Sequence, residues 1–233
     1  LDIAANNFKF NKKYKMSYKK KILFSSNDLY DYLLKLIKSY PIISIEDPFA
    51  EEDIEYFKKL KENSPSYLQI VGDDLVVTNT KLIKKAYKKN AINSILIKPN
   101  QIGTISETSN ALKLSDELNL MSILSARSGE SEDNFISDLS VGWNMKQLKV
   151  GSFSRSERMS KWNHCLRIGE KLKNKYANPL PQYSAGSEEN KWYNYCVNNN
   201  IRISQKPVDG EKGKWYITVS LGPYKKGETP HVS

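Results

Sequence analysis

The chain has 233 residues, a formal net charge of +10, 39% hydrophobic residues and 27% charged residues. This composition is that of an ordinary globular protein and excludes the disordered and fibrous classes, and the length suits one large domain or one domain with an appendage. No stretch approaches the roughly 20 apolar residues of a membrane helix, and the N-terminus lacks the order of a signal peptide. We therefore expect a soluble, cytoplasmic protein with no membrane partner.

The positive charge and the cysteines limit the possible partners. Cys165 and Cys196 have no paired spacing, so neither a zinc site nor a disulfide framework is expected. The charge could attract nucleic acid, or it could belong to the solvated faces of lysine-rich helices such as residues 81–90. No signature of aromatic residues interleaved with basic residues is found, so we favour solvated helices and expect no nucleic-acid partner.

Apolar runs alternate with helical repeats along residues 1–175. A short apolar run at 1–5 is followed by a lysine-rich connection. The later apolar runs predict strands at 41–45, 67–71, 94–97, 121–124 and 147–150. Repeats at helical spacing predict helices at about 29–40, 51–60, 80–86, 105–118, 135–139 and 155–175. Ser25, Ser26, Thr78 and Asn79 are candidate N-caps, and Thr104 with Glu107 forms a capping-box pair.

Strands that alternate with helices in this way predict a parallel sheet with right-handed crossovers. The apolar runs are continuous, which indicates strands covered on both faces. Polar residues end the runs at nearly regular intervals after the first, which is the pattern of a barrel that delivers one side chain per strand to a shared mouth. We predict an α/β fold, an incomplete (β/α)8 TIM-type barrel of about six strand–helix units, with a small α+β extension that we leave unassigned.

Three of these strand ends carry carboxylates: Asp2, Glu46 and Asp73. Oxygen ligands without histidine suit a hard cation, and Mg²⁺ is the expected one. Lys98 and Lys149 end later strands, and a lysine near a divalent cation and another lysine is disfavoured in its charged form, so Lys98 can act as a base. A single such residue is more often a turn or helix-cap residue, but six in register favour a site for removing a proton next to a carboxylate.

Several stretches resemble enolase, the phosphopyruvate hydratase of glycolysis. They are "DIAA", "YPIISIEDPF", "VGDDLVVTN", "ILIKPNQIGT", "RSGESEDNFISDL", and "RSER" with "LRIGE" beyond it. The resemblance covers about residues 1–175, and we assign residues 1–178 to a partial enolase-like barrel domain. It implies that Asp2, Glu46 and Asp73 bind Mg²⁺ and that Lys98 takes the proton from carbon 2 of 2-phosphoglycerate.

The resemblance also implies a substrate-binding set. Arg127 and Ser128 would contact the substrate phosphate and Lys149 its carboxylate. With Ser125 beside them and the ligands Glu46 and Asp73, these residues complete the expected substrate site. The resemblance further implies that the full-length protein is a homo-oligomer.

The sequence departs from the enolase pattern in three places. Ala126 stands where the family usually has a substrate-binding histidine, and Asn6-Asn7 replaces Ser-Glu. The chain also starts at the third barrel strand of the pattern, without the N-terminal domain, its mobile loop and the glutamates of the acid step. Six strands cannot close an eight-stranded barrel, and losing general acid catalysis alone costs about 10²- to 10⁴-fold in rate. We expect a fragment, or a split or decayed copy, with little dehydratase activity alone.

The remainder of the chain shows no enolase pattern. Residues 179–187 are rich in proline, glycine and serine and are predicted to be a linker to an unassigned extension at 188–233. The extension predicts a helix near 192–197, a turn at Asp209-Gly210 and strands at 201–204 and 215–221. Its aromatic residues could stack on single-stranded nucleic acid or form a small β core, and its low net charge favours the core. His231 is too isolated to indicate a site, and His164 is expected to be a packed or capping residue.

The leading functional prediction is an enolase-type, Mg²⁺-dependent lyase that interconverts 2-phosphoglycerate and phosphoenolpyruvate. One rival is a related dehydratase or racemase acting on another α-hydroxy or α-amino acid, which Arg127, Ser128 and Lys149 disfavour. Another rival is a decayed homologue that binds a polyanion or a protein partner without catalysis.

Overall fold

The computed structural model describes residues 1–17 and 22–172, together with two strands, β9 (Ile201–Pro207) and β10 (Trp215–Leu221). Apart from residues 39–41, the described residues up to 172 fall in one compact unit, and β9 and β10 fall in a second, where they pair antiparallel. The two predicted strands of the extension are thus confirmed. The predicted linker at 179–187, the helix near 192–197, the Asp209-Gly210 turn and His231 lie outside the described residues.

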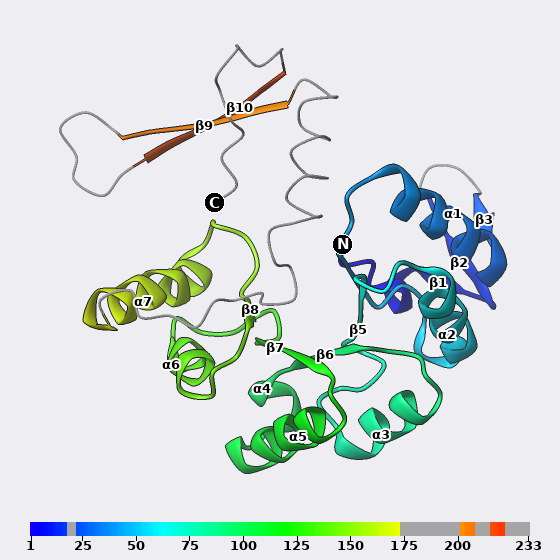
Figure 1. The fold of residues 1–233 in the computed structure, drawn as a ribbon, viewed down its shortest axis with the longest axis horizontal. Coiled ribbons are helices and arrows are strands. Elements are labelled where there is room, and N and C mark those ends of the chain that lie inside the picture. Colours follow the sequence, from blue (N-terminus) through cyan, green and yellow to red (C-terminus); the bar gives the residue numbers. More distant parts are fainter. Residues whose placement is uncertain (18–21, 173–200, 208–214, 222–233) are drawn as a thin grey trace. The chain divides into compact units, whose positions relative to one another are not determined.

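The centre of the first unit is a parallel sheet in the order β4-β5-β6-β7-β8, so each strand pairs with the next one along the chain (Figure 1). The strands are β4 (Ser44–Glu46), β5 (Gln69–Gly72), β6 (Ser94–Ile97), β7 (Met121–Ser125) and β8 (Gln147–Lys149). Every residue of β5 and β6 is buried, as continuous apolar runs predict. This order and direction confirm the predicted fold class, an incomplete α/β barrel.

The sheet is strongly curved. Four strand spacings of about 4.8 Å would separate β4 from β8 by roughly 19 Å in a flat sheet. Lys149 at the end of β8 nevertheless reaches Glu46 at the end of β4, with 2.7 Å between Nζ and Oε1. Gln69 on β5 and Gln147 on β8 also bond through their amides, at 3.1 Å. The two edges of the sheet therefore approach each other, as in a barrel wall.

The predicted strand at residues 1–5 is reduced to a single bridge between Asp2 and Glu46. Ile3 N donates to the Glu46 carbonyl at 2.9 Å and Glu46 N donates to the Leu1 carbonyl at 2.8 Å, so this segment runs parallel to β4. It ends early because Ala4 adopts a left-handed conformation (φ 48°) and turns the chain into a 3-10 helix, η1 (Ala5–Phe8).

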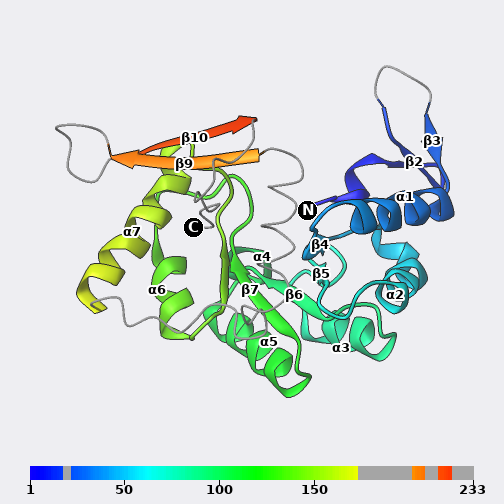
Figure 2. The same ribbon diagram turned by 45° about the horizontal axis from the view of Figure 1, so that its top comes forward.

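Helices follow the strands along the chain, and most of them lie around the outside of the curved sheet (Figure 2). They are α1 (Ser26–Ser39), η2 (Glu51–Asp53), α2 (Ile54–Asn63), α3 (Thr80–Lys88), α4 (Pro99–Ile102), α5 (Ile105–Glu117), α6 (Phe135–Gly142) and α7 (Ser156–Leu172). Asn79 caps α3 by accepting from Lys81 N and Leu82 N, and Thr104 caps α5 by accepting from Glu107 N. None of the helices in the described part of the chain has the length and hydropathy needed to span a membrane.

The lysine-rich connection after η1 contains a sheet that the sequence did not reveal. It pairs β1 (Lys9–Phe10), β2 (Lys13–Lys15) and β3 (Leu23–Phe24) antiparallel. Tyr14 of β2 is fully buried, and its hydroxyl donates to Asp53 at 2.5 Å and accepts from Ala50 N at 2.9 Å. Strands of two or three residues are too short for hydrophobic periodicity to detect.

Helix α7 makes polar contacts with α6 and with the segment that precedes α6. His164 Nε2 lies 2.9 Å from both carboxylate oxygens of Asp138, so His164 is a packed residue, as predicted. Lys161, which is only 2% exposed, donates from Nζ to the carbonyls of Ser131 and Glu157, both at 2.5 Å. These contacts connect α7 to the segment that follows β7.

Candidate active site

The carboxyl ends of the strands surround a polar cavity of about 440 Å³. Most of the predicted site residues line it: Asp2, Asp73, Lys98, Ser125, Arg127, Ser128 and Lys149. Glu46 is not among the lining residues, but it bonds directly to Lys149. The structure therefore brings all of the predicted site residues to one region, while their functional roles remain predictions.

Lys149 joins two of the predicted metal ligands. Its Nζ donates to Asp2 Oδ2 at 2.8 Å and to both carboxylate oxygens of Glu46, at 2.7 and 2.8 Å. Burial lowers the pKa of Lys149, but the hydrogen bonds to Asp2 and Glu46 outweigh it and raise the pKa above its ordinary value. Burial raises the pKa of Glu46, and the nearby ammonium only partly offsets this effect. Lys149 is therefore held as a cation.

Lys98 and Asp73 form the second buried pair. Lys98 Nζ donates to Asp73 Oδ2 at 2.5 Å, and each side chain is only 11% exposed. Lys98 N donates to the hydroxyl of Thr78 at 2.9 Å, which fixes the backbone where β6 ends. The other carboxylate oxygen of Asp73, Oδ1, is buried and has no hydrogen-bond partner among the described residues. A buried carboxylate oxygen without a partner is costly, which makes it a candidate ligand atom.

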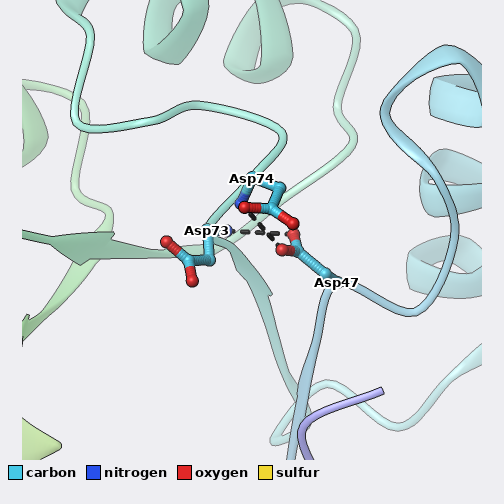
Figure 3. Close-up of side chains that lie close together, drawn as sticks. All are labelled: Asp47, Asp73 and Asp74. Carbon is cyan, nitrogen blue, oxygen red and sulfur yellow. Dashed lines mark hydrogen bonds between the residues drawn. The ribbon is translucent and has the colours of Figure 1, made fainter. Parts of the chain in front are cut away.

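Asp73 also belongs to a second cluster of acidic side chains. One carboxylate oxygen from each of Asp47, Asp73 and Asp74 lies within 4.8 Å of the other two. Asp47 follows β4 with a left-handed backbone (φ 40°), and its carboxylate accepts from Asp73 N at 3.0 Å and from Asp74 N at 2.7 Å. Burial raises the pKa of Asp47 to about 7 against the lowering effect of these two N–H groups. Figure 3 shows the Asp73 carboxylate directed away from Asp47.

Asp47 and Asp74 were not assigned to the site from the sequence. The sequence does show two adjacent acidic residues at the ends of β4 and β5, Glu46-Asp47 and Asp73-Asp74, but only the first residue of each pair was assigned to the site. Asp47 holds the loop after β5 in place, because its two carboxylate oxygens accept hydrogen bonds from the backbone N–H groups of Asp73 and Asp74. Its contacts support the position of Asp73.

The donor chemistry of the region fits a hard divalent cation. Every acidic candidate supplies carboxylate oxygens, which suit Mg²⁺ better than softer metals. Asp73 belongs both to the predicted set with Asp2 and Glu46 and to the group with Asp47 and Asp74. In the described part of the chain, Asp73 Oδ1 is a buried carboxylate oxygen without a hydrogen-bond partner, which suits it to a cation.

The segment after β7 forms another side of the cavity. Ser125 is buried at the end of β7 and pairs with Lys149 in the sheet register, while Arg127 and Ser128 are exposed. Arg127 N donates to Asn100 Oδ1 at 3.0 Å, which ties this segment to the start of α4. Ala126 lines the cavity where the family histidine is expected, and it packs partly against the hydrophobic core.

Asn6, at the first position of the Asn6-Asn7 departure, makes two polar contacts. Asn6 Nδ2 donates to Asp74 Oδ2 at 3.3 Å, and Asn6 Oδ1 accepts from Glu51 N at 3.0 Å. Asn7 lines the cavity. The asparagine amide thus links η1, η2 and the loop after β5 at this side of the mouth.

A curved parallel sheet, outer helices and an acidic cavity at the carboxyl ends of the strands define the class of α/β barrel proteins with a candidate cation site. A family model described as "Enolase, C-terminal TIM barrel domain" matches residues 1–183. The chain belongs to the enolase family, as the resemblance predicted.

Named enolases are similar to this chain over most of its length. The enolase of Ehrlichia ruminantium (strain Gardel) is 50% identical over 174 residues, which are 75% of this chain and 40% of that protein. The enolase of Anaplasma phagocytophilum (strain HZ) is 49% identical over 172 residues, 74% of this chain and 39% of that protein. That of Mycoplasmopsis synoviae (strain 53) is 47% identical over 154 residues, 66% of this chain and 34% of that protein. The chain thus spans about 40% of the length of the first of these relatives.

Proposed function

We propose that the chain supplies the metal-binding and proton-abstracting half of an enolase-type carbon–oxygen lyase. The reaction is the interconversion of 2-phosphoglycerate and phosphoenolpyruvate in glycolysis, in the cytoplasm, with Mg²⁺ as the cofactor and a homo-oligomer as the active assembly. The observation that supports it most is the buried contact between Lys98 and Asp73 at the cavity. The similarity to named enolases supports the choice of this substrate.

Lys98 is the proposed base. It follows β6 directly and lines the cavity, and its amine takes the proton from carbon 2 of the substrate, next to the carboxylate. A base must be neutral, and in this structure Lys98 Nζ donates to the carboxylate of Asp73. A cation on the free oxygen of Asp73 would compete with Lys98 for this negative charge. The cofactor, when bound, supplies positive charge that stabilises the substrate carboxylate as the proton leaves.

The other cations hold the substrate. Lys149 is kept protonated by Asp2 and Glu46 and is proposed to face the substrate carboxylate. Arg127 and Ser128 are exposed at the cavity and are proposed to bind the phosphate. An arginine suits this role because its planar group can donate two parallel hydrogen bonds to one phosphate.

Ala126 favours a second candidate, a decayed homologue that binds a partner without catalysis. The side chain that the family normally places there is replaced by a methyl group, so one substrate contact is lost. This candidate predicts a folded protein that shows no turnover of 2-phosphoglycerate.

The test is a dehydration assay with 2-phosphoglycerate, with and without Mg²⁺, on the product of the full native open reading frame and on its Lys98→Ala variant. We expect Mg²⁺-dependent turnover that falls by about 10²- to 10⁴-fold in Lys98→Ala, as for the loss of a general base. Lys113→Ala is the matched control, because Lys113 is an exposed lysine of α5 outside the cavity. Absent turnover, turnover without metal, or turnover indifferent to Lys98 would contradict the proposal.

A further inference from the structure

The "RSER" motif contains an arginine to which the resemblance gave no role. Arg158 lies on the first turn of α7 and lines the same cavity as Arg127, Ser128 and Lys149. Its side chain is partly buried, and Arg158 Nη1 donates to the hydroxyl of Ser152 at 3.0 Å. No ion pair joins Arg158 to a carboxylate among the described residues.

The cations around the cavity divide into two groups. Lys98 is paired with Asp73, and Lys149 is paired with Asp2 and Glu46. Arg127 and Arg158 have no carboxylate partner in the described part of the chain. Positive groups without a carboxylate partner can bind an anionic ligand without giving up an ion pair, and two guanidinium groups suit the charge of a phosphate.

The backbone of the loop before α7 makes room for the Arg158 side chain. Gly151 has a backbone φ of 106°, which residues other than glycine rarely adopt. A Cβ at this position would lie 3.1 Å from Arg158 Nε, 3.2 Å from Cδ and 3.3 Å from Cζ. The absence of a side chain at Gly151 therefore allows the guanidinium to lie against the loop, with Ser152 as its hydrogen-bond acceptor.

We infer that Arg158 is a second phosphate-binding guanidinium that acts together with Arg127. The inference rests on the proposed function, since it concerns the phosphate of the same substrate. Gly151 and Ser152 hold the Arg158 side chain toward the cavity, and the fork of the guanidinium leaves other N–H groups free to donate to the phosphate oxygens.

The experiment measures the affinity of the Mg²⁺-loaded protein for 2-phosphoglycerate, and for glycerate, which lacks the phosphate, by calorimetry. We expect Arg158→Met to bind 2-phosphoglycerate about 10- to 100-fold more weakly, as for the loss of a charge-assisted hydrogen bond, and to bind glycerate as the unmodified protein does. Arg167→Met is the matched control, because Arg167 is an exposed arginine of the same helix outside the cavity, and it should leave both affinities unchanged.

Other outcomes separate the inference from the proposed function. Unchanged 2-phosphoglycerate affinity in Arg158→Met, or an equal loss for glycerate, overturns the inference and leaves the proposed function intact. No binding of 2-phosphoglycerate by the unmodified protein overturns both. Should Arg158→Met fail to fold, Arg158→Lys is the second variant to measure. It keeps the positive charge and the aliphatic part of the side chain but loses the planar guanidinium group. The inference then predicts a severalfold loss confined to 2-phosphoglycerate, and an unchanged affinity overturns it.

Discussion

Replacing Tyr14 by Phe tests the polar network that joins the N-terminal sheet to the barrel. The change removes one hydroxyl from a fully buried ring. That hydroxyl donates to Asp53 at 2.5 Å and accepts from Ala50 N at 2.9 Å. A hydrogen bond to a charged group contributes about 1.5–3 kcal/mol, and a buried N–H left unpaired costs about 1–3 kcal/mol. Because the two terms share one atom and overlap, we expect a loss of about 2–4 kcal/mol.

Urea denaturation followed by circular dichroism measures this loss as a lower free energy of unfolding. Tyr32→Phe is the control, because Tyr32 is 43% exposed and surface changes usually stay within about 0.5 kcal/mol. A Tyr14→Phe protein within about 0.5 kcal/mol of the unmodified protein would refute the reasoning, since it would mean that neither contact of the hydroxyl contributes to stability.

Two further predictions concern charged side chains that make several hydrogen bonds. Burial raises the pKa of Asp53, but hydrogen bonds from Lys9, Tyr14 and Ser26 outweigh it, so the pKa in the folded state is lowered. The stabilisation is therefore present above the ordinary carboxyl pKa, about 3.9, and is lost as the pH falls through the folded value. The difference in unfolding free energy between the protein and Asp53→Asn should shrink below about pH 4, and a constant difference from pH 7 to pH 3 would contradict this. Lys161→Met leaves two carbonyls without the ammonium and should lower the unfolding free energy by about 1–3 kcal/mol, whereas an unchanged thermal midpoint would show the contact to be dispensable.

The sequence predicted those strands and helices of the barrel that have a long apolar run, a helical repeat or a clear N-cap residue. The strand at 94–97 is observed with the predicted bounds, and Asn79 and Thr104 cap the helices as expected. The segment at 1–5 is less regular than predicted because the left-handed Ala4 ends its pairing after one bridge. Local patterns do not show such a backbone change.

Features that depend on distant contacts were not predictable in the same way. The sheet at residues 9–24 is held by Tyr14 and Lys9 bonding to Asp53, residues far apart in the sequence. Regular strand ends predicted that Asp2, Glu46 and Lys149 would share a mouth, but only the curvature of the sheet places β8 within reach of β4. The role of Asp47 likewise depends on two backbone N–H groups of a loop on the neighbouring strand.

The central claim is that carboxylates at neighbouring strand ends bind a hard divalent cation through Asp73. Calorimetric titration of the protein with Mg²⁺ tests it directly, with Asp73→Asn as the variant and Asp116→Asn, an exposed aspartate of α5, as the control. We expect Mg²⁺ binding that is at least about tenfold weaker in Asp73→Asn, the size expected for losing one charged contact, and unchanged in Asp116→Asn. Equal Mg²⁺ affinity in the protein and in Asp73→Asn, or no Mg²⁺ binding at all, would contradict the account.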